Sequence, residues 1–158
     1  MRTNFLALYY TAVRMDKEQK VLLAWSLAWE GTITIVRQSE KKTSRGFCLR
    51  PRLHISNADK SLLEKFQSYI GCGSVTSEQT RYPHQGKWKT LYCWTVGDRE
   101  KGMNLLREIL PFLPAKKRQA ELLLEFFELR DHREHEPYPE RVLEIHKEMA
   151  QLNRRGAH

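Results

Sequence analysis

Residues 22–35 constrain the fold more than any other part of this chain. They read Leu-Leu-Ala-Trp-Ser-Leu-Ala-Trp-Glu-Gly-Thr-Ile-Thr-Ile, which predicts an almost wholly apolar helix, a glycine turn and a strand of alternating residues. A helix that is apolar all round needs cover on more than one side, and a partner helix is the simplest second cover. The carboxylate of Glu30 meets the negative end of the helix dipole, where a cation is preferred. We therefore expect a positive group, such as a metal ion, beside it.

The elements around this stretch predict an α+β fold. Asp16 followed by Gln19 is typical of a capping box for the first helix. The apolar pattern then predicts a hairpin over 32–55, a helix over 59–70 capped by Ser56 or Asn57, a hairpin over 74–96 with its turn at 83–86, and helices over 98–110, 115–130 and about 137–155. This αββαββα order predicts one four-stranded antiparallel sheet with helices on one face. We expect a single domain over 1–158, with a core of about 16–131 and a C-terminal helical extension of about 137–155.

The charge of the chain narrows the class of partner. There are 27 Lys and Arg against 19 Asp and Glu, which gives a net charge of +8 and favours nucleic acid first and an anionic membrane second. No apolar run approaches the ~18 residues that span a bilayer, and we expect no signal peptide, since a convincing cleavage site is lacking. Cys48, Cys72 and Cys93 are odd in number and widely spaced, so we expect reduced thiols in a cytoplasmic protein.

The outward residues of the two hairpins are polar and basic. With Val75, Leu91 and Cys93 assigned to the helix side, the outward set is Thr32, Thr34, Gln38, Arg50, Arg52, His54, Thr76, Glu78, Thr90 and Tyr92. A two-stranded ribbon fits the DNA major groove, where Arg and Gln can bond to base edges. An ordinary solvated sheet is the alternative, whereas the deep, narrow major groove of RNA does not admit such a ribbon. Strands of about eight residues reach ~26 Å, or roughly one half-site of a dimeric protein.

Three segments resemble the LAGLIDADG family of homing endonucleases in its single-motif form. Residues 23–31 occupy the nine motif positions, and residues 55–63 resemble the family's passage from second strand to second helix. Residues 113–122 resemble the opening of a late helix, where a Lys and a Gln-Ala pair are typical. The resemblance covers about 22–129. It implies an intron-encoded, homodimeric, magnesium-dependent endonuclease that cuts a pseudo-palindromic double-stranded DNA site of about two helical turns.

The resemblance also implies roles for particular residues. Glu30 matches the acidic motif position and becomes a metal ligand, with the Trp29 carbonyl as a further oxygen ligand that suits Mg²⁺. Lys116 matches the basic active-site residue, which would stabilise phosphate charge or lower the pKa of a water molecule. Asn57 matches a polar position that orients the solvent nucleophile. The alternatives are an exposed helix-end carboxylate, a surface lysine and a helix cap, respectively.

The motif departs from the family pattern at its close-packing positions. Trp25 and Trp29 stand where the family usually has glycine or alanine, and Ala28 replaces the first Asp of the motif. Ala24 and Ala28 lie beside the tryptophans, so a rotated helix would still offer a ridge of small residues. We therefore expect Ala24, Trp25 and Ala28 at the dimer interface. The alternative is that the indoles fold back onto their own protomer.

These features together predict a site-specific double-strand DNA endonuclease of the homing type. The alternatives on the same fold are an RNA-splicing maturase and a non-catalytic DNA-binding regulator. Glu30 and Lys116 favour the enzyme, because a maturase need not retain them. We expect no membrane partner. If the intron-bearing genome belongs to an organelle, the protein is expected in that compartment instead of the cytoplasm.

Overall fold

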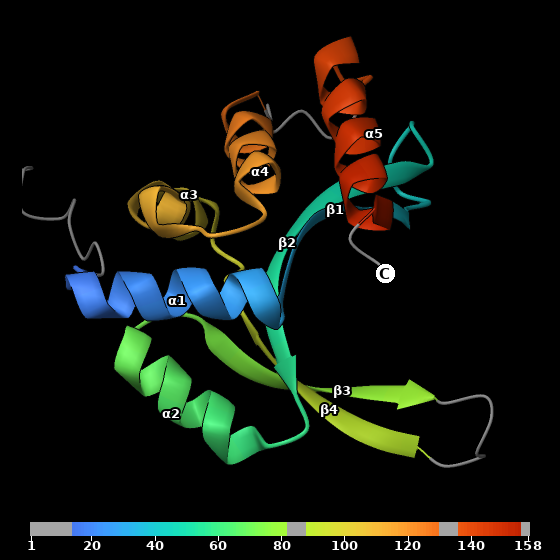
Figure 1. Cartoon of the computed structure of the whole chain (residues 1–158). Helices are drawn as coiled ribbons and strands as arrows, with labels where there is room; N and C mark the ends of the chain where they lie inside the picture. Colours follow the sequence, from blue (N-terminus) through green and yellow to red (C-terminus); the bar gives the residue numbers. More distant parts are fainter. Residues whose placement is uncertain (1–13, 82–87, 130–135, 156–158) are drawn as a thin grey trace, which may run out of the picture.

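The structure is a computed structural model that describes residues 14–81, 88–129 and 136–155. Its elements are α1 (Lys17–Trp29), β1 (Gly31–Ser39), β2 (Phe47–Asn57), α2 (Lys60–Ile70), β3 (Ser74–Arg81), β4 (Trp88–Thr95), α3 (Arg99–Ile109), the 3₁₀ turn η1 (Leu110–Phe112), α4 (Lys117–Leu129) and α5 (Glu140–Arg155). The strands form one antiparallel sheet in the order β1-β2-β4-β3. The helices cover one face of the curved sheet (Figure 1), so the predicted α+β fold is confirmed. The turn expected at 83–86 lies outside the described residues.

The start of α1 is as the sequence predicts, but the start of α2 differs. Asp16 caps α1, and its carboxylate accepts from the Gln19 amide at 2.8 Å while the Gln19 side chain accepts from the Asp16 amide. The cap of α2 is Asp59, which accepts from the amides of Ser61 and Leu62. The expected caps, Ser56 and Asn57, are still in β2. The reason is that β4 pairs with β2 as far as Asn57 and extends the strand.

The core joins α1 to both halves of the sheet. Leu23 and Leu27 of α1 are fully buried, and so is Trp94 of β4, whose ring packs edge-on against Phe66 of α2 at 5.3 Å between centroids. The indole N–H of Trp94 donates to the Cys72 carbonyl at 2.8 Å, so the buried ring keeps its polar group bonded. The core thus packs α1 against β1 and α2 against β4.

The length of the helices and the state of the cysteines bear on the class of protein. Within the described ranges, no helix combines the length and the apolar character needed to cross a membrane. Cys48, Cys72 and Cys93 carry free thiols, as predicted. Burial raises the pKa of the Cys72 and Cys93 thiols, which keeps both in the neutral form near pH 7.

Candidate functional site

The acidic residue Glu30 lies at the junction of α1 and β1. It caps α1 in helical conformation, and its amide donates to the Ser26 carbonyl at 2.9 Å. A glycine must follow, because a Cβ atom on Gly31 would lie 2.6 Å from the Cα of Leu27. The last turn of α1 contains no basic residue, and the Glu30 side chain is exposed. The tight turn therefore presents a carboxylate to solvent at the end of the sheet.

The positive group expected at the end of α1 is the ammonium of Lys116, which directly precedes α4. The Lys116 ammonium donates to the Gly31 carbonyl at 2.6 Å and to the Leu27 carbonyl at 3.1 Å. These carbonyls belong to the end of α1, where the negative pole of the helix dipole favours a positive group. Burial lowers the pKa of Lys116, while the charge of Glu30 acts in the opposite direction. The structure thus brings Glu30 and Lys116 together, as neighbours at one end of the sheet.

The backbone of Lys116 is unusual for a lysine. Its φ is 62°, in the left-handed region that side chains with a Cβ atom disfavour by roughly 1–2 kcal/mol. Its carbonyl accepts from the Ala120 amide at 3.0 Å, so Lys116 stands directly at the start of α4. A residue keeps such a conformation only where the surrounding structure imposes it. The start of α4 is therefore held in a conformation that directs the ammonium to α1.

Asn57 lies at the same end of the sheet as Glu30. It is the last residue of β2, two positions beyond Ile55, which pairs with Gly31. Its side-chain oxygen accepts from the Asp59 amide at 2.8 Å, which shapes the turn into α2. Asn57 is therefore a turn residue and not the helix cap of the alternative, since the cap of α2 is Asp59. The amide hydrogens of Asn57 are its remaining donors.

Most of the residues expected on the outward face do lie there. In the ladder, Thr32 is opposite His54 and Thr34 is opposite Arg52, while the alternate residues of β1 and β2 are buried under the helices. The members of the expected set on the open face are Thr32, Thr34, Gln38, Arg50, Arg52, His54, Thr76 and Glu78. The side of the sheet that carries these residues is its open face.

The assignment of the β4 faces was wrong. Cys93 pairs with Ser56 and Thr76, and its thiol lies 3.3 Å from Glu78 Oε2, so it is on the open face. Tyr92 and Thr90 alternate with it and belong to the helix side, where Tyr92 packs against the core. Cys93 is buried even so, because Ser56 and Glu78 surround its thiol. The large apolar Trp94 was the signal that indicates which residues of β4 face the helices, since such a ring is usually buried in the core.

A hollow lies in the middle of the open face. Its lining includes Arg52, His54, Thr76, Glu78, Cys93 and Thr95. Burial, and then the charge of Arg52, lower the pKa of His54, whereas Glu78 opposes this. His54 is consequently neutral at pH 7, and among the described residues its buried Nδ1 has no hydrogen-bond partner. The hollow is therefore lined by an arginine fork, a carboxylate and a neutral imidazole.

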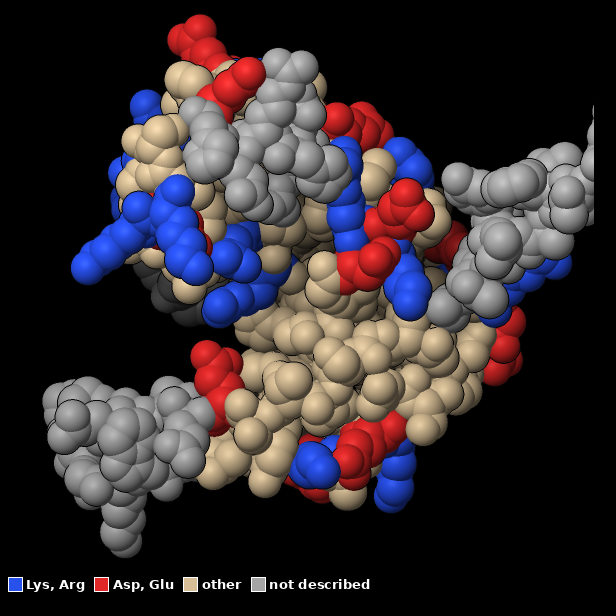
Figure 2. Space-filling model, turned by 180° about the vertical axis from the view of Figure 1, so that it is seen from behind, with Lys and Arg blue, Asp and Glu red and all other residues tan. Residues whose placement is uncertain are grey.

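The exposed side of α1 differs from the predicted ridge of alanines. Leu22, Trp25 and Trp29 are 43%, 48% and 74% exposed, and the two indoles stack at 6.5 Å between centroids. Ala24 is completely buried in its own protomer, so its expected place at a dimer interface was wrong. The helix is turned so that Ala24 meets the core and the two indoles meet solvent, while Ala28 is half-buried. Figure 2 shows a broad area without charged side chains across the middle of the molecule, at the height of α1.

One protomer alone does not assemble a cluster of metal ligands. Within the described ranges, no three His, Cys, Asp or Glu side chains gather around a common point. An ion at Glu30 would therefore need further ligands from backbone carbonyls, water, substrate or a second chain. All of these are oxygen donors, which is the donor set that Mg²⁺ prefers.

Comparison with known proteins identifies the family. The sequence model described as LAGLIDADG endonuclease matches residues 29–129, and the chain belongs to this family. Its fold is similar to the homing endonuclease I-CvuI bound to the I-CreI target (TM-score 0.57, 19% identity, 84% of this chain and 95% of that one). It is also similar to the archaeal intron-encoded homing endonuclease I-Vdi141I complexed with DNA (TM-score 0.67, 18% identity, 85% and 83%). A search of the curated proteins gave no significant match.

Proposed function

We propose that this protein is a site-specific endonuclease that cuts both strands of a DNA site as a homodimer, with a divalent metal ion, Mg²⁺. The observation that carries the proposal is the placement of Glu30 and Lys116 side by side at one end of the open face. That arrangement puts a carboxylate and a cation next to a surface of strand-borne Thr, Gln and Arg side chains. Solved structures of the same fold in complex with DNA support it.

In the proposed site, Glu30, Trp29, Lys116 and Asn57 would each have a chemical task. The exposed Glu30 carboxylate, with the Trp29 carbonyl as a further oxygen, would hold the metal ion. When bound, the ion supplies Lewis acidity and lowers the pKa of a water molecule. Lys116 spends two of its three N–H donors on carbonyls, so one remains for a phosphate oxygen. The amide hydrogens of Asn57 would orient the attacking water at the same end of the sheet.

A plasmid assay tests the proposal. Protein and Mg²⁺ are incubated with a supercoiled plasmid that carries the uninterrupted insertion site, and we expect conversion to the linear form. A maturase would instead bind the intron RNA and leave the plasmid intact. A non-catalytic regulator would retard the DNA fragment without cutting it. Either of these two results would overturn the proposed endonuclease.

Replacing Lys116 with Met is expected to slow cleavage by about 10²–10³-fold, as for the loss of one electrostatic donor. The DNA affinity should change little, because the open face makes most of the contacts. Single-turnover cleavage measures the rate, and Lys117→Met is the control, since Lys117 is exposed on the next position. The rate should also fall as pH rises through the Lys116 pKa, which burial places below that of a free lysine. An unchanged rate in Lys116→Met would exclude it from the active site.

The two arginines of β2 are expected to contact DNA differently. Arg52 lines the hollow, whereas Arg50 is 3.7 Å from Glu40 and donates to the Cys48 sulfur at the edge of the face. Arg52→Ala should therefore relax base preference at one position by about 1–3 kcal/mol. Arg50→Ala should weaken binding to all DNA sequences equally. It should also reduce the slope of log K against log[salt] by about one. Binding to a set of single-base site variants at several salt concentrations separates the two effects.

A further inference from the structure

The C-terminal helix α5 lies beyond the residues that match the family, yet it packs on the elements that carry the site. Val142, Ile145 and Met149 are buried on its inner side, against α4 and β1. In Figure 1, α5 runs beside α4 and across β1. The helix therefore contacts both the element that begins next to Lys116 and the strand that follows Glu30.

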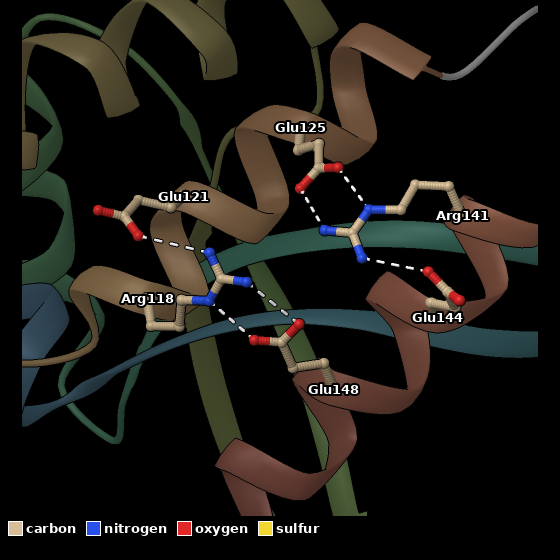
Figure 3. A network of polar contacts seen from close by, with 6 residues as sticks. All are labelled: Arg118, Glu121, Glu125, Arg141, Glu144 and Glu148. Atoms are coloured by element: carbon tan, nitrogen blue, oxygen red, sulfur yellow. Dashed lines mark hydrogen bonds and ion pairs between the residues drawn. The ribbon is translucent and has the colours of Figure 1, made fainter.

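Two polar contacts of α5 fall very close to the site. Arg118, two residues after Lys116, is held side-on by Glu148, with Nε at 2.8 Å and the terminal nitrogen at 3.2 Å (Figure 3). Asn153 donates to the carbonyl of Ile33 at 3.2 Å, and Ile33 is two residues after Gly31. The helix is thus bonded to the start of α4 and to the start of β1, the same two segments that the Lys116 ammonium joins.

The conformation of Lys116 explains why such bonds matter. Its left-handed φ of 62° is disfavoured, so the first turn of α4 must be held from outside to keep it. The hydrogen bonds of its ammonium act at the far end of a flexible side chain, whereas Arg118 is anchored within the first turn of α4 itself. Fixing that turn fixes the point from which the side chain reaches α1.

We propose that α5 positions Lys116, and that Arg118 and Glu148 are the positioning residues. Glu148 holds Arg118, Arg118 holds the first turn of α4, and this turn directs the Lys116 ammonium to the end of α1. Asn153 fixes the start of β1 in the same frame. The consequence for catalysis rests on the proposed endonuclease function, but the placement of the ammonium does not.

The chain offers a closely matched control. Arg141 of α5 makes the same side-on pair with Glu125 of α4, at 2.6 and 2.8 Å (Figure 3). The side chains of the two pairs are similarly exposed, at 48% and 35% for Arg118–Glu148 and 42% and 35% for Arg141–Glu125. Both pairs join α4 to α5, but Glu125 lies about two turns beyond Arg118 along α4, further from Lys116. Removing either carboxylate therefore weakens the same helix contact, and only one removal acts next to Lys116.

The first test measures the lysine itself, without DNA or metal. Acetic anhydride is added to wild type, Glu148→Ala and Glu125→Ala, and the acetylation of Lys116 is followed by mass spectrometry. We expect faster acetylation of Lys116 in Glu148→Ala than in wild type, and the wild-type rate in Glu125→Ala. Equal rates in the two variants would overturn the positioning role. This result stands whether or not the protein cuts DNA.

The second test measures cleavage with the same variants. Glu148→Ala should lower the single-turnover rate by about 10–100-fold at an unchanged DNA dissociation constant, because a small misplacement of a catalytic group is costly. Glu125→Ala should keep the wild-type rate, and the exchange Arg118→Glu with Glu148→Arg should restore much of the loss. An equal loss of rate in Glu148→Ala and Glu125→Ala would show that the helix contact is merely structural, and would overturn the positioning role. If wild type does not cut at all, the endonuclease function fails, and the acetylation result still decides the positioning.

Discussion

Replacing Glu30 with Gln is expected to abolish cleavage while specific DNA binding stays near the wild-type level. Glutamine keeps the shape of the side chain but removes the charge that a divalent ion needs. A metal ion supplies several kcal/mol of transition-state stabilisation, and each 1.4 kcal/mol is tenfold in rate, so we expect a loss of about 10³-fold or more. Binding should persist because, in the proposed complex, the open face and not the end of α1 would make most of the contacts with DNA.

The measurements are single-turnover cleavage with Mg²⁺ and equilibrium binding with Ca²⁺. Glu18→Gln is the matched control, since Glu18 is an exposed carboxylate in the first turn of the same helix. The fold should be unaffected in both variants, because neither side chain is buried. Cleavage by Glu30→Gln near the wild-type rate would place the active site elsewhere. Loss of binding together with cleavage would show that Glu30 acts in assembly or in DNA contact.

Alternation of apolar residues was enough to predict the sheet and its first hairpin. Ile33, Ile35, Leu53 and Ile55 are large and β-branched or aliphatic, so their spacing fixes which side faces the helices. In β4 the same rule misled, because Leu91 and the nearly apolar Cys93 were treated as core residues, whereas both lie on the open face. The alternation there is set by Trp94, whose burial contributes far more than that of a thiol.

The relation of Lys116 to α1 could be predicted only in part. The resemblance assigned a basic residue to this position, but no spacing indicates that its ammonium bonds to the Leu27 and Gly31 carbonyls. The left-handed backbone of Lys116 could not be foreseen either, since lysine has no preference for it. Both features depend on how α4 and α5 pack on the sheet, which is tertiary information that a local pattern does not contain.

Which side of α1 is exposed to solvent could not be predicted from the sequence either. All but one of residues 21–29 are apolar, so periodicity does not distinguish the core side from the exposed side. Packing decides it: Leu23, Ala24 and Leu27 fill the space above the sheet, and Leu22, Trp25 and Trp29 remain exposed. A dimer built on α1 would thus bury the indoles, and the alanines do not have to form the ridge.

Replacing Trp25 with Glu is therefore expected to leave the protein folded and monomeric, without double-strand cleavage. An exposed stripe of Leu22, Trp25 and Trp29 is costly in water, and a twofold axis along α1 would cover it in both protomers. Burying one such side chain contributes about 1.5–3 kcal/mol, and a twofold dimer buries Trp25 of both protomers. The loss is then ~3–6 kcal/mol, or roughly 10²–10⁴ in the dimer dissociation constant.

Sedimentation at micromolar concentration without DNA measures this directly, with the plasmid assay beside it. Leu143→Glu is the control, because Leu143 is a similarly exposed apolar residue on α5, away from the stripe. We expect a dimer for wild type and for Leu143→Glu, and a monomer for Trp25→Glu. The two Glu30 carboxylates of such a dimer would lie near the axis, where a divalent ion relieves their repulsion. A wild-type protein that sediments as a monomer would contradict the free dimer, and assembly would then have to occur on DNA.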